Sequence, residues 1–181
     1  GGSTGGLTPT RQVEQLPGFD DCDDAVDVDW LSVDRPTASL NPGASLTIRV
    51  TVDSTVLAQP GTYTAGLLVL EDTPYPSPAV GVSFEVAAPK RWGRIAGLVQ
   101  GVSCAGDAAP LPGATVQIDT AAGNLSLVTA ADGRYSYWID SAANPLTVIV
   151  AKDGYTIAVS KVRLRAGETV PDDADLTRAD C

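Results

Sequence analysis

Short runs in which apolar and polar side chains alternate constrain this chain more than any other feature. Residues 46–52 alternate cleanly, several later runs do the same, and helical periodicity is almost absent. Side chains two positions apart share one face of a strand, so this period indicates β-strands. In this run we expect Leu46, Ile48, Val50 and Val52 to face a core. Clusters of Gly and Pro, which suit turns, separate the runs.

The second half of the chain continues the pattern. Strand signals recur over residues 94–99, 115–118, 125–129, 134–138 and 146–151. Asp132-Gly133 lies between two of these runs and suits the positive φ of a type I′ turn, which predicts a hairpin there. Many short strands with no helices between them predict an all-β chain that folds as antiparallel β-sandwiches.

Charge divides the chain in two. The 181 residues carry a formal net charge of −10. Residues 1–89 hold 3 basic and 12 acidic side chains, whereas residues 90–181 hold 9 basic and 10 acidic ones. This change near Pro89 predicts two consecutive domains. We expect a linker with an acidic segment over residues 1–24, an immunoglobulin-like sandwich over 25–89 and a second sandwich over 90–181.

Composition also excludes several classes of function. The chain has no His, so by itself it cannot form a Ser-His-Asp or Cys-His catalytic site or a His-ligated metal centre. Its acidic charge disfavours nucleic acid as a partner. No apolar run approaches the roughly 18–20 residues that span a bilayer, so we expect no membrane insertion. The absence of Met indicates a processed product or a fragment of a longer protein.

Two of the three cysteines, Cys104 and Cys181, bracket the second predicted domain. If they lie on neighbouring strands, a disulfide can join them, and this would indicate an oxidising compartment and a secreted or cell-surface location. Cys22 is then either free or bonded to an upstream partner. Three buried thiols are the alternative. No pair has CxxC spacing, so the redox and zinc motifs of that type are absent.

The densest charge lies in the run Asp20-Asp21-Cys22-Asp23-Asp24. Carboxylate oxygens are preferred ligands of Ca²⁺, so Asp20, Asp21, Asp23 and Asp24 are a candidate calcium site. No cofactor is expected, apart from calcium if these residues bind it. The spacing does not match an EF-hand loop, and a solvated acidic loop or linker is the alternative.

Four aromatic residues of the second domain are candidate binding residues, namely Trp92, Tyr135, Tyr137 and Trp138. Trp92 lies at the domain junction. On a strand over residues 134–138, Tyr135 and Tyr137 share one face and Trp138 points to the other. One of these faces belongs to the core. The other exposes a large apolar area that can serve as a domain interface or as a ligand platform.

The Trp30-Leu31-Ser32 start and the Pro60-Gly61-Thr62-Tyr63 step occur in the order expected of a known family. On these residues, the segment 25–88 resembles the immunoglobulin-like modules of the BACON type. Such modules follow the catalytic domains of secreted bacterial hydrolases, including subtilisin-like proteases. The turn also has a physical reading, because it delivers Tyr63 to a sandwich corner, where the ring can be buried and the hydroxyl can reach the main chain.

The most specific signal in the chain is Asp132-Gly133-Arg134-Tyr135 followed by Lys152-Asp153-Gly154-Tyr155. On these two elements, residues 93–178 are similar to the carboxypeptidase regulatory-like domain. That resemblance implies a transthyretin-like sandwich. It also implies an accessory domain of secreted or surface proteins that has no active site of its own.

These features together predict a non-catalytic accessory region of a larger secreted or surface bacterial protein, and not an enzyme. Such a region spaces, stabilises or targets a neighbouring domain. Its expected partners are the upstream domain of the parent protein and, for targeting, an extracellular polysaccharide or protein. The alternatives are a module whose main role is to bind polysaccharide or protein, and a structural stalk or filament repeat.

Overall fold

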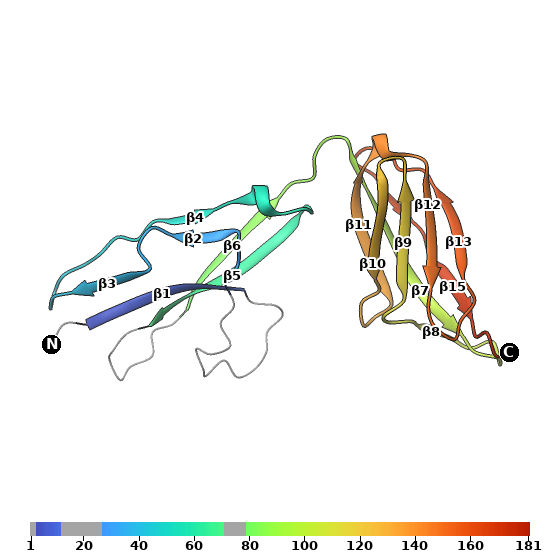
Figure 1. Cartoon of the computed structure of the whole chain (residues 1–181), viewed down its shortest axis with the longest axis horizontal. Coiled ribbons are helices and arrows are strands. Elements are labelled where there is room, and N and C mark those ends of the chain that lie inside the picture. The colour runs from blue at the N-terminus through green and yellow to red at the C-terminus, as the bar shows by residue number, and fades with distance from the viewer. Residues whose placement is uncertain (1–2, 12–26, 71–78) are drawn as a thin grey trace. The chain divides into compact units, whose positions relative to one another are not determined.

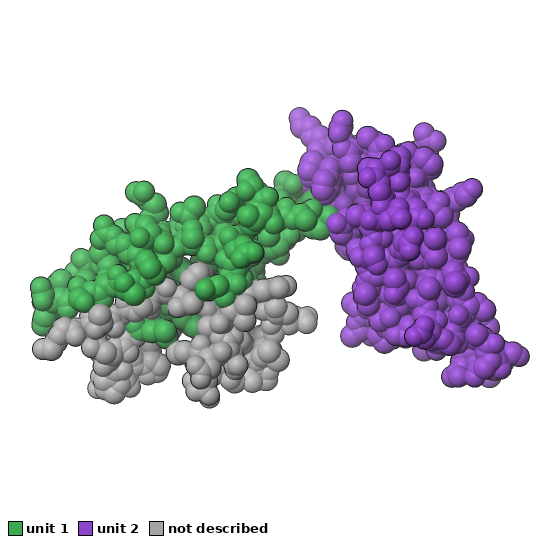
Figure 2. Space-filling model, in the orientation of Figure 1, with its two compact units in different colours: residues 1–87 green, residues 88–181 purple. Residues whose placement is uncertain are grey.

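The computed structural model describes residues 3–11, 27–70 and 79–181 (Figure 1). It divides into two compact units, residues 1–87 and residues 88–181, called unit 1 and unit 2 below (Figure 2). Within the described ranges the only helical elements are the short turns η2 (Ser54–Val56) and η3 (Ser141–Ala143), and no helix is long and apolar enough to cross a membrane. The predicted all-β class is confirmed.

Unit 1 contains two sheets. The larger is antiparallel and has the strand order β3 (Thr37–Leu40), β1 (Ser3–Arg11), β5 (Gly61–Leu70) and β6 (Val80–Val86). The smaller pairs β2 (Leu31–Val33) with β4 (Val50–Val52). A small core is shared by them and consists of Val28, Trp30, Leu31, Ala65 and Leu67.

An aromatic cluster completes this core. The Trp30 ring centre lies 5.0 Å from that of Phe84, which lies 5.6 Å from that of Tyr63. The Tyr63 hydroxyl donates a 2.7 Å hydrogen bond to the main-chain oxygen of Gln59. The prediction that Tyr63 packs at a corner with its hydroxyl on the main chain is therefore confirmed. Aromatic pairs add about 0.5–1.5 kcal/mol beyond the burial of their area, which matters in a core this small.

Two expectations for unit 1 are wrong. Part of the expected linker, Ser3–Arg11, is strand β1, which pairs with both β3 and β5. Ladder hydrogen bonds come from the main chain, so a Gly- and Thr-rich segment can pair without an alternating side-chain pattern. The expected buried strand over 46–52 is reduced to β4, where Val50 and Val52 are each 39% exposed. Alternation shows which side chains share a face and does not show whether another layer covers that face.

Unit 2 is a sandwich of two sheets. The first, called the β12 sheet, has the antiparallel order β10 (Gly123–Val128), β9 (Thr115–Thr120), β12 (Leu146–Ala151) and β13 (Ala158–Val162). The second, called the β7 sheet, is built around β7 (Trp92–Val102) and contains β11 (Arg134–Asp140), β14 (Thr169–Pro171), β15 (Ala174–Thr177) and β8 (Ala108–Pro110).

The core of unit 2 lies between these two sheets. Alternate residues of each strand point inward, and the largest fully buried side chains include Ile95, Ile118, Leu146 and Leu176. The outward residues of β7 are Trp92, Arg94, Ala96, Leu98 and Gln100, which are all half-buried.

The C-terminal segment passes very close to β7. A Cβ atom added at Gly97 would overlap the main-chain oxygen of Asp172 and would lie 2.8 Å from a ring carbon of Tyr135. A Cβ atom at Gly93 would overlap the main-chain oxygen of Arg165 in the same way. Glycine at these two positions therefore makes room for the last strands of the chain.

The strand pairing differs from the expectation in two respects. The sandwich is not wholly antiparallel, because β14 and β15 run parallel to β7. The predicted hairpin at Asp132-Gly133 is also wrong, since β10 pairs with β9 and β11 pairs with β7. Gly133 does form a turn, with a φ of 75°. The buried Thr129 just before it bonds to Leu111 and Ala114, so the chain crosses to the other sheet as it turns.

Candidate binding site

The structure places Tyr135 and Tyr137 against the core. Tyr135 is only 6% exposed, and Tyr137 packs against the same cluster. Both lie opposite inward positions of β7, Gly97 and Ile95. Of the four candidate aromatic residues, Tyr135 is therefore enclosed by protein, and Tyr137 is half-buried and packed against the core.

The Tyr135 hydroxyl belongs to a polar bridge between the two sheets. It donates to Asp172, with the main-chain oxygen at 2.7 Å and the carboxylate Oδ2 at 2.8 Å. The Ser160 hydroxyl donates to Oδ1 of the same carboxylate at 2.7 Å. Ser160 lies on β13 and Tyr135 on β11, so Asp172 links the two layers. A network of this kind has a structural role, because its polar groups are hydrogen-bonded to one another.

We expect this bridge to make the stability of unit 2 sensitive to alkaline pH. Burial, and then the hydrogen bond to Asp172, raise the pKa of Tyr135 above its ordinary value of 10.0. Above about pH 10 the unfolded chain loses the Tyr135 hydroxyl proton, whereas the folded chain keeps it. The free energy of unfolding therefore falls as pH rises, by at most about 1.4 kcal/mol per pH unit. Urea unfolding of the wild type and Tyr135→Phe between pH 8 and 11, with Cys22 alkylated, checks this. Parallel pH profiles for the two proteins would contradict it.

The other two aromatic candidates come together on the outer face of the β7 sheet. Trp138 lies directly opposite Arg94 in the ladder between β11 and β7. Trp92 lies two positions before Arg94 on the same strand and therefore on the same face. Trp92 and Trp138 are therefore diagonal neighbours across the strand pair, and residues in such positions are about 7–8 Å apart. We call Trp92, Arg94, Ser136 and Trp138 the Trp–Arg face.

Arg94 is the charged centre of the Trp–Arg face. Its Nη2 donates a 2.9 Å hydrogen bond to the Ser136 hydroxyl, and its Nε is enclosed without an acceptor. Two nearby arginines in the chain order, Arg91 and Arg134, form salt bridges with Asp140 and Asp132. Arg94 forms none with any carboxylate in the described part of the chain. The face thus contains a half-buried cation whose charge no described carboxylate neutralises through a salt bridge.

The main chain holds Trp92 firmly. Its N–H donates to Pro89 at 2.9 Å, and its carbonyl oxygen accepts from Gly167 at 2.8 Å. Asp140, opposite Trp92 in the ladder, pairs with Arg91 at 2.6 Å. The Ala142 N–H and then the Arg91 guanidinium lower the pKa of Asp140, so this carboxylate stays ionised beside the face.

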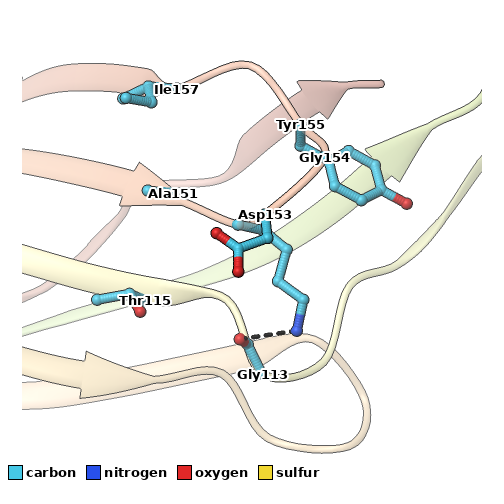
Figure 3. A pocket seen from close by; sticks show the side chains of 8 residues that line it. Gly113, Thr115, Ala151, Asp153, Gly154, Tyr155 and Ile157 are labelled. Carbon is cyan, nitrogen blue, oxygen red and sulfur yellow. Dashed lines mark hydrogen bonds between the residues drawn. The ribbon is translucent and has the colours of Figure 1, made fainter. Parts of the chain in front are cut away.

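A separate shallow depression of about 430 Å³ lies at the end of the β12 sheet (Figure 3). Lys152 lines it, but its ammonium group donates to the main-chain oxygens of Pro112 and Gly113 at 3.0 and 2.9 Å. The depression adjoins an apolar outer face on which Ile157 and Val159 are 66% and 64% exposed. With its cation used internally, the depression offers few polar groups to orient a ligand.

The candidate calcium ligands Asp20, Asp21, Asp23 and Asp24 lie outside the described residues. Among the residues that are described, one group of potential metal ligands comes together, namely Cys104, Asp180 and Cys181. The two sulfur atoms are bonded to each other, so they cannot act as thiolate ligands.

Cys104 and Cys181 form a disulfide, with their Cα atoms 5.2 Å apart. Cys104 follows β7, and Cys181 follows β15 after a short turn. Hydrogen bonds fix the segment before Cys181, since Arg178 donates to Val102 and Ala179 donates to Gly154. Arg178 also pairs with Asp180 at 2.8 Å and lowers the pKa of that carboxyl group. The segment after β15 is thus attached to the end of the central strand.

Sequence reasoning missed Arg94 and Ser136. The period of two does place Arg94 on the same face as Trp92, so half of the signal was present. The other half was the pairing of β11 with β7, which brings Trp138 and Ser136 beside Arg94. That pairing joins strands about 40 residues apart, and no local pattern reveals it.

Comparison with known proteins gives low similarity. No family model matches the chain, and no curated protein matches it. Among solved structures, the Bacillus anthracis TIE protein aligns at a TM-score of 0.40 and 11% identity, over 98% of this chain and 34% of that one. The minor pilin GBS52 of Streptococcus agalactiae aligns at a TM-score of 0.40 and 13% identity, over 98% of this chain and 83% of that one. The chain thus spans about a third of the TIE protein.

Proposed function

We propose that this chain is a non-catalytic accessory region of a larger secreted or surface bacterial protein. The observation that carries the proposal is the disulfide between Cys104 and Cys181, which attaches the segment after β15 to the central strand of unit 2. Structural disulfides persist in oxidising environments outside the cytosol. An exposed disulfide that attaches the segment after the last strand to the rest of the sandwich stabilises the domain. Such stability suits a module that is connected to other domains.

The use of polar groups supports a non-catalytic role. The strongly shifted titratable group, Tyr135, is bonded to Asp172 inside the sandwich. Asp140 and Asp180 are paired with arginines, and the Lys152 ammonium group bonds to main-chain oxygens. Catalytic groups need polar atoms that remain free for a substrate, whereas these are occupied by neighbouring protein atoms.

The two family resemblances support the same proposal. BACON-type and carboxypeptidase regulatory-like modules both accompany larger proteins, so an upstream catalytic or adhesive domain is the expected partner. Among the three accessory roles, the Trp–Arg face favours targeting over spacing, because two partly exposed indoles on one face suit the stacking of sugar rings. A stalk or filament repeat is the second candidate, and the exposed apolar residues Ile157 and Val159 favour it by offering a contact surface.

The first test is hydrolysis and retention by the purified chain. We expect no turnover of peptide or glycoside substrates, and retention on at least one insoluble polymer among cellulose, chitin, peptidoglycan and collagen. Hydrolysis that survives repurification would contradict the accessory role. Absence of retention, together with self-association that grows with concentration in sedimentation, would replace targeting with the stalk role.

A further inference from the structure

Building on the targeting role proposed above, we propose that the Trp–Arg face is the binding site and that its ligand is a polysaccharide bearing carboxylate groups. Trp92 and Trp138 stack on sugar rings, and the Arg94 guanidinium group receives a carboxylate between them. The proposal rests on three observations, namely the placement of the indoles, the uncompensated charge of Arg94, and the small residues beside them.

The indoles lie where two successive sugar units can reach them. One face of a sugar ring carries C–H groups, and these pack against the π-face of an indole with a favourable electrostatic match. Both tryptophans are partly exposed, so part of each indole surface is open to solvent. They lie on neighbouring strands, and main-chain hydrogen bonds fix the backbone of Trp92. A site on strands is preorganised, which lowers the entropy cost of binding.

Arg94 selects for an acidic ligand. A guanidinium group binds a carboxylate through two parallel N–H donors, and this geometry is stronger than a neutral hydrogen bond. The hydrogen bond to Ser136 orients the group, while no described carboxylate within 4.0 Å competes for its charge. A chain with a net charge of −10 has acidic groups in excess. Arg94 forms no salt bridge with any of the described ones and lies between two indoles, so it can receive a negative group from a ligand.

The residues next to these groups include short side chains and hydroxyl groups, which suit contact with a sugar. Ser136, Ala96 and Pro171 lie opposite one another across three strands, directly beside the row of Trp138, Arg94 and Thr169. Ser136 and Ala96 have short side chains, so they add little bulk beside this row. The hydroxyl groups of Ser136 and Thr169 stand on either side of the strand that carries Arg94, where they can bond to sugar hydroxyl groups.

Affinity electrophoresis of the whole chain tests the proposal with soluble polygalacturonate and alginate. The comparison ligands are the carboxyl-reduced forms of the same polymers and a neutral glucan. We expect the wild type to bind the carboxylated polymers at least about tenfold more tightly than the reduced ones, because only a carboxylate forms a charge-assisted hydrogen bond with Arg94.

The variants divide the contributions. Trp138→Ala and Trp92→Ala are each expected to weaken binding at least about tenfold on the carboxylated polymers, since each removes a stacking surface. Arg94→Gln is expected to bind the carboxylated and reduced polymers equally. Arg163→Gln is the matched control for charge, because Arg163 is exposed and follows β13 of the other sheet. Ile157→Ala is the control for exposed apolar area. Both controls should bind as the wild type does, and circular dichroism verifies that every variant is folded.

The outcomes separate this inference from the targeting role on which it rests. If the wild type binds none of these polymers and is retained on none of the insoluble ones, both fail. If it binds a polymer and folded Trp138→Ala and Arg94→Gln bind equally well, targeting stands and the Trp–Arg face is overturned as the site. If reduced and carboxylated polymers bind the wild type equally, the assignment of a carboxylated ligand is overturned.

Discussion

Replacing both Cys104 and Cys181 with serine is expected to lower the free energy of unfolding of unit 2 by about 2–4 kcal/mol. The disulfide joins residues 77 positions apart and therefore closes a loop that contains most of the unit. In the oxidised protein, that loop restricts the unfolded chain, and removing the bond returns this conformational freedom. Native-state hydrogen exchange in β9 and β12 measures the effect, because these strands belong to unit 2 alone.

The matched control for this experiment is Cys22→Ser, which removes a thiol and leaves the disulfide intact. We expect it to leave the exchange rates of β9 and β12 unchanged. If the double serine variant and the control exchange at the same rates, the disulfide adds nothing to the stability of unit 2. The stabilising role on which the accessory proposal depends would then be lost.

Gly97→Ala is expected to destabilise unit 2 by about 2–3 kcal/mol, near the upper end of the usual cost of overpacking. The added methyl group would overlap the main-chain oxygen of Asp172 and would press on the Tyr135 ring. A main-chain oxygen cannot turn aside as a flexible side chain can. The C-terminal segment must therefore move, and the bridge from Tyr135 and Ser160 to Asp172 is strained with it.

Gly81→Ala is the matched control for this substitution. Gly81 also lies in a strand, β6, with no atom within 4 Å of an added Cβ and with no positive φ. Alanine has the higher intrinsic preference for an ordered chain, so this variant should be neutral or slightly stabilising. The two variants are compared by hydrogen exchange in the strands of each unit. A loss of stability in Gly97→Ala no larger than in the control would show that the close approach of Asp172 to β7 is wrong.

Local patterns in the sequence predicted the class of the fold, the position of some strands and the role of Tyr63. Alternation over residues 115–118 and 146–151 corresponds to β9 and β12, whose inward residues are fully buried. The corner role of Tyr63 also followed from its neighbours, because a Pro-Gly turn and a strand start are both local features. Such expectations need only the period of a strand and the φ of a turn.

Features that depend on distant pairing could not be predicted. The Asp132-Gly133 turn looks like a hairpin from its own residues, and only the buried Thr129 and the partners of β10 and β11 make it a crossing between sheets. The Trp–Arg face likewise requires the register that sets Trp138 against Arg94. Residues 3–11 have no alternating side-chain pattern. They form a strand because their main chain pairs with β3 on one side and with β5 on the other. In each case the decisive partner lies far away in the chain.

The bond between Cys104 and Cys181 also has a mechanical consequence. β7 starts near the beginning of unit 2 and leads to Cys104, while the disulfide connects Cys104 directly to Cys181. A pulling force applied at Ala88 and Cys181 is therefore transmitted along residues 88–104 and across the sulfur bridge. Residues 105–180 lie outside this covalent path, so tension applied at these two points does not unravel the strands that they form.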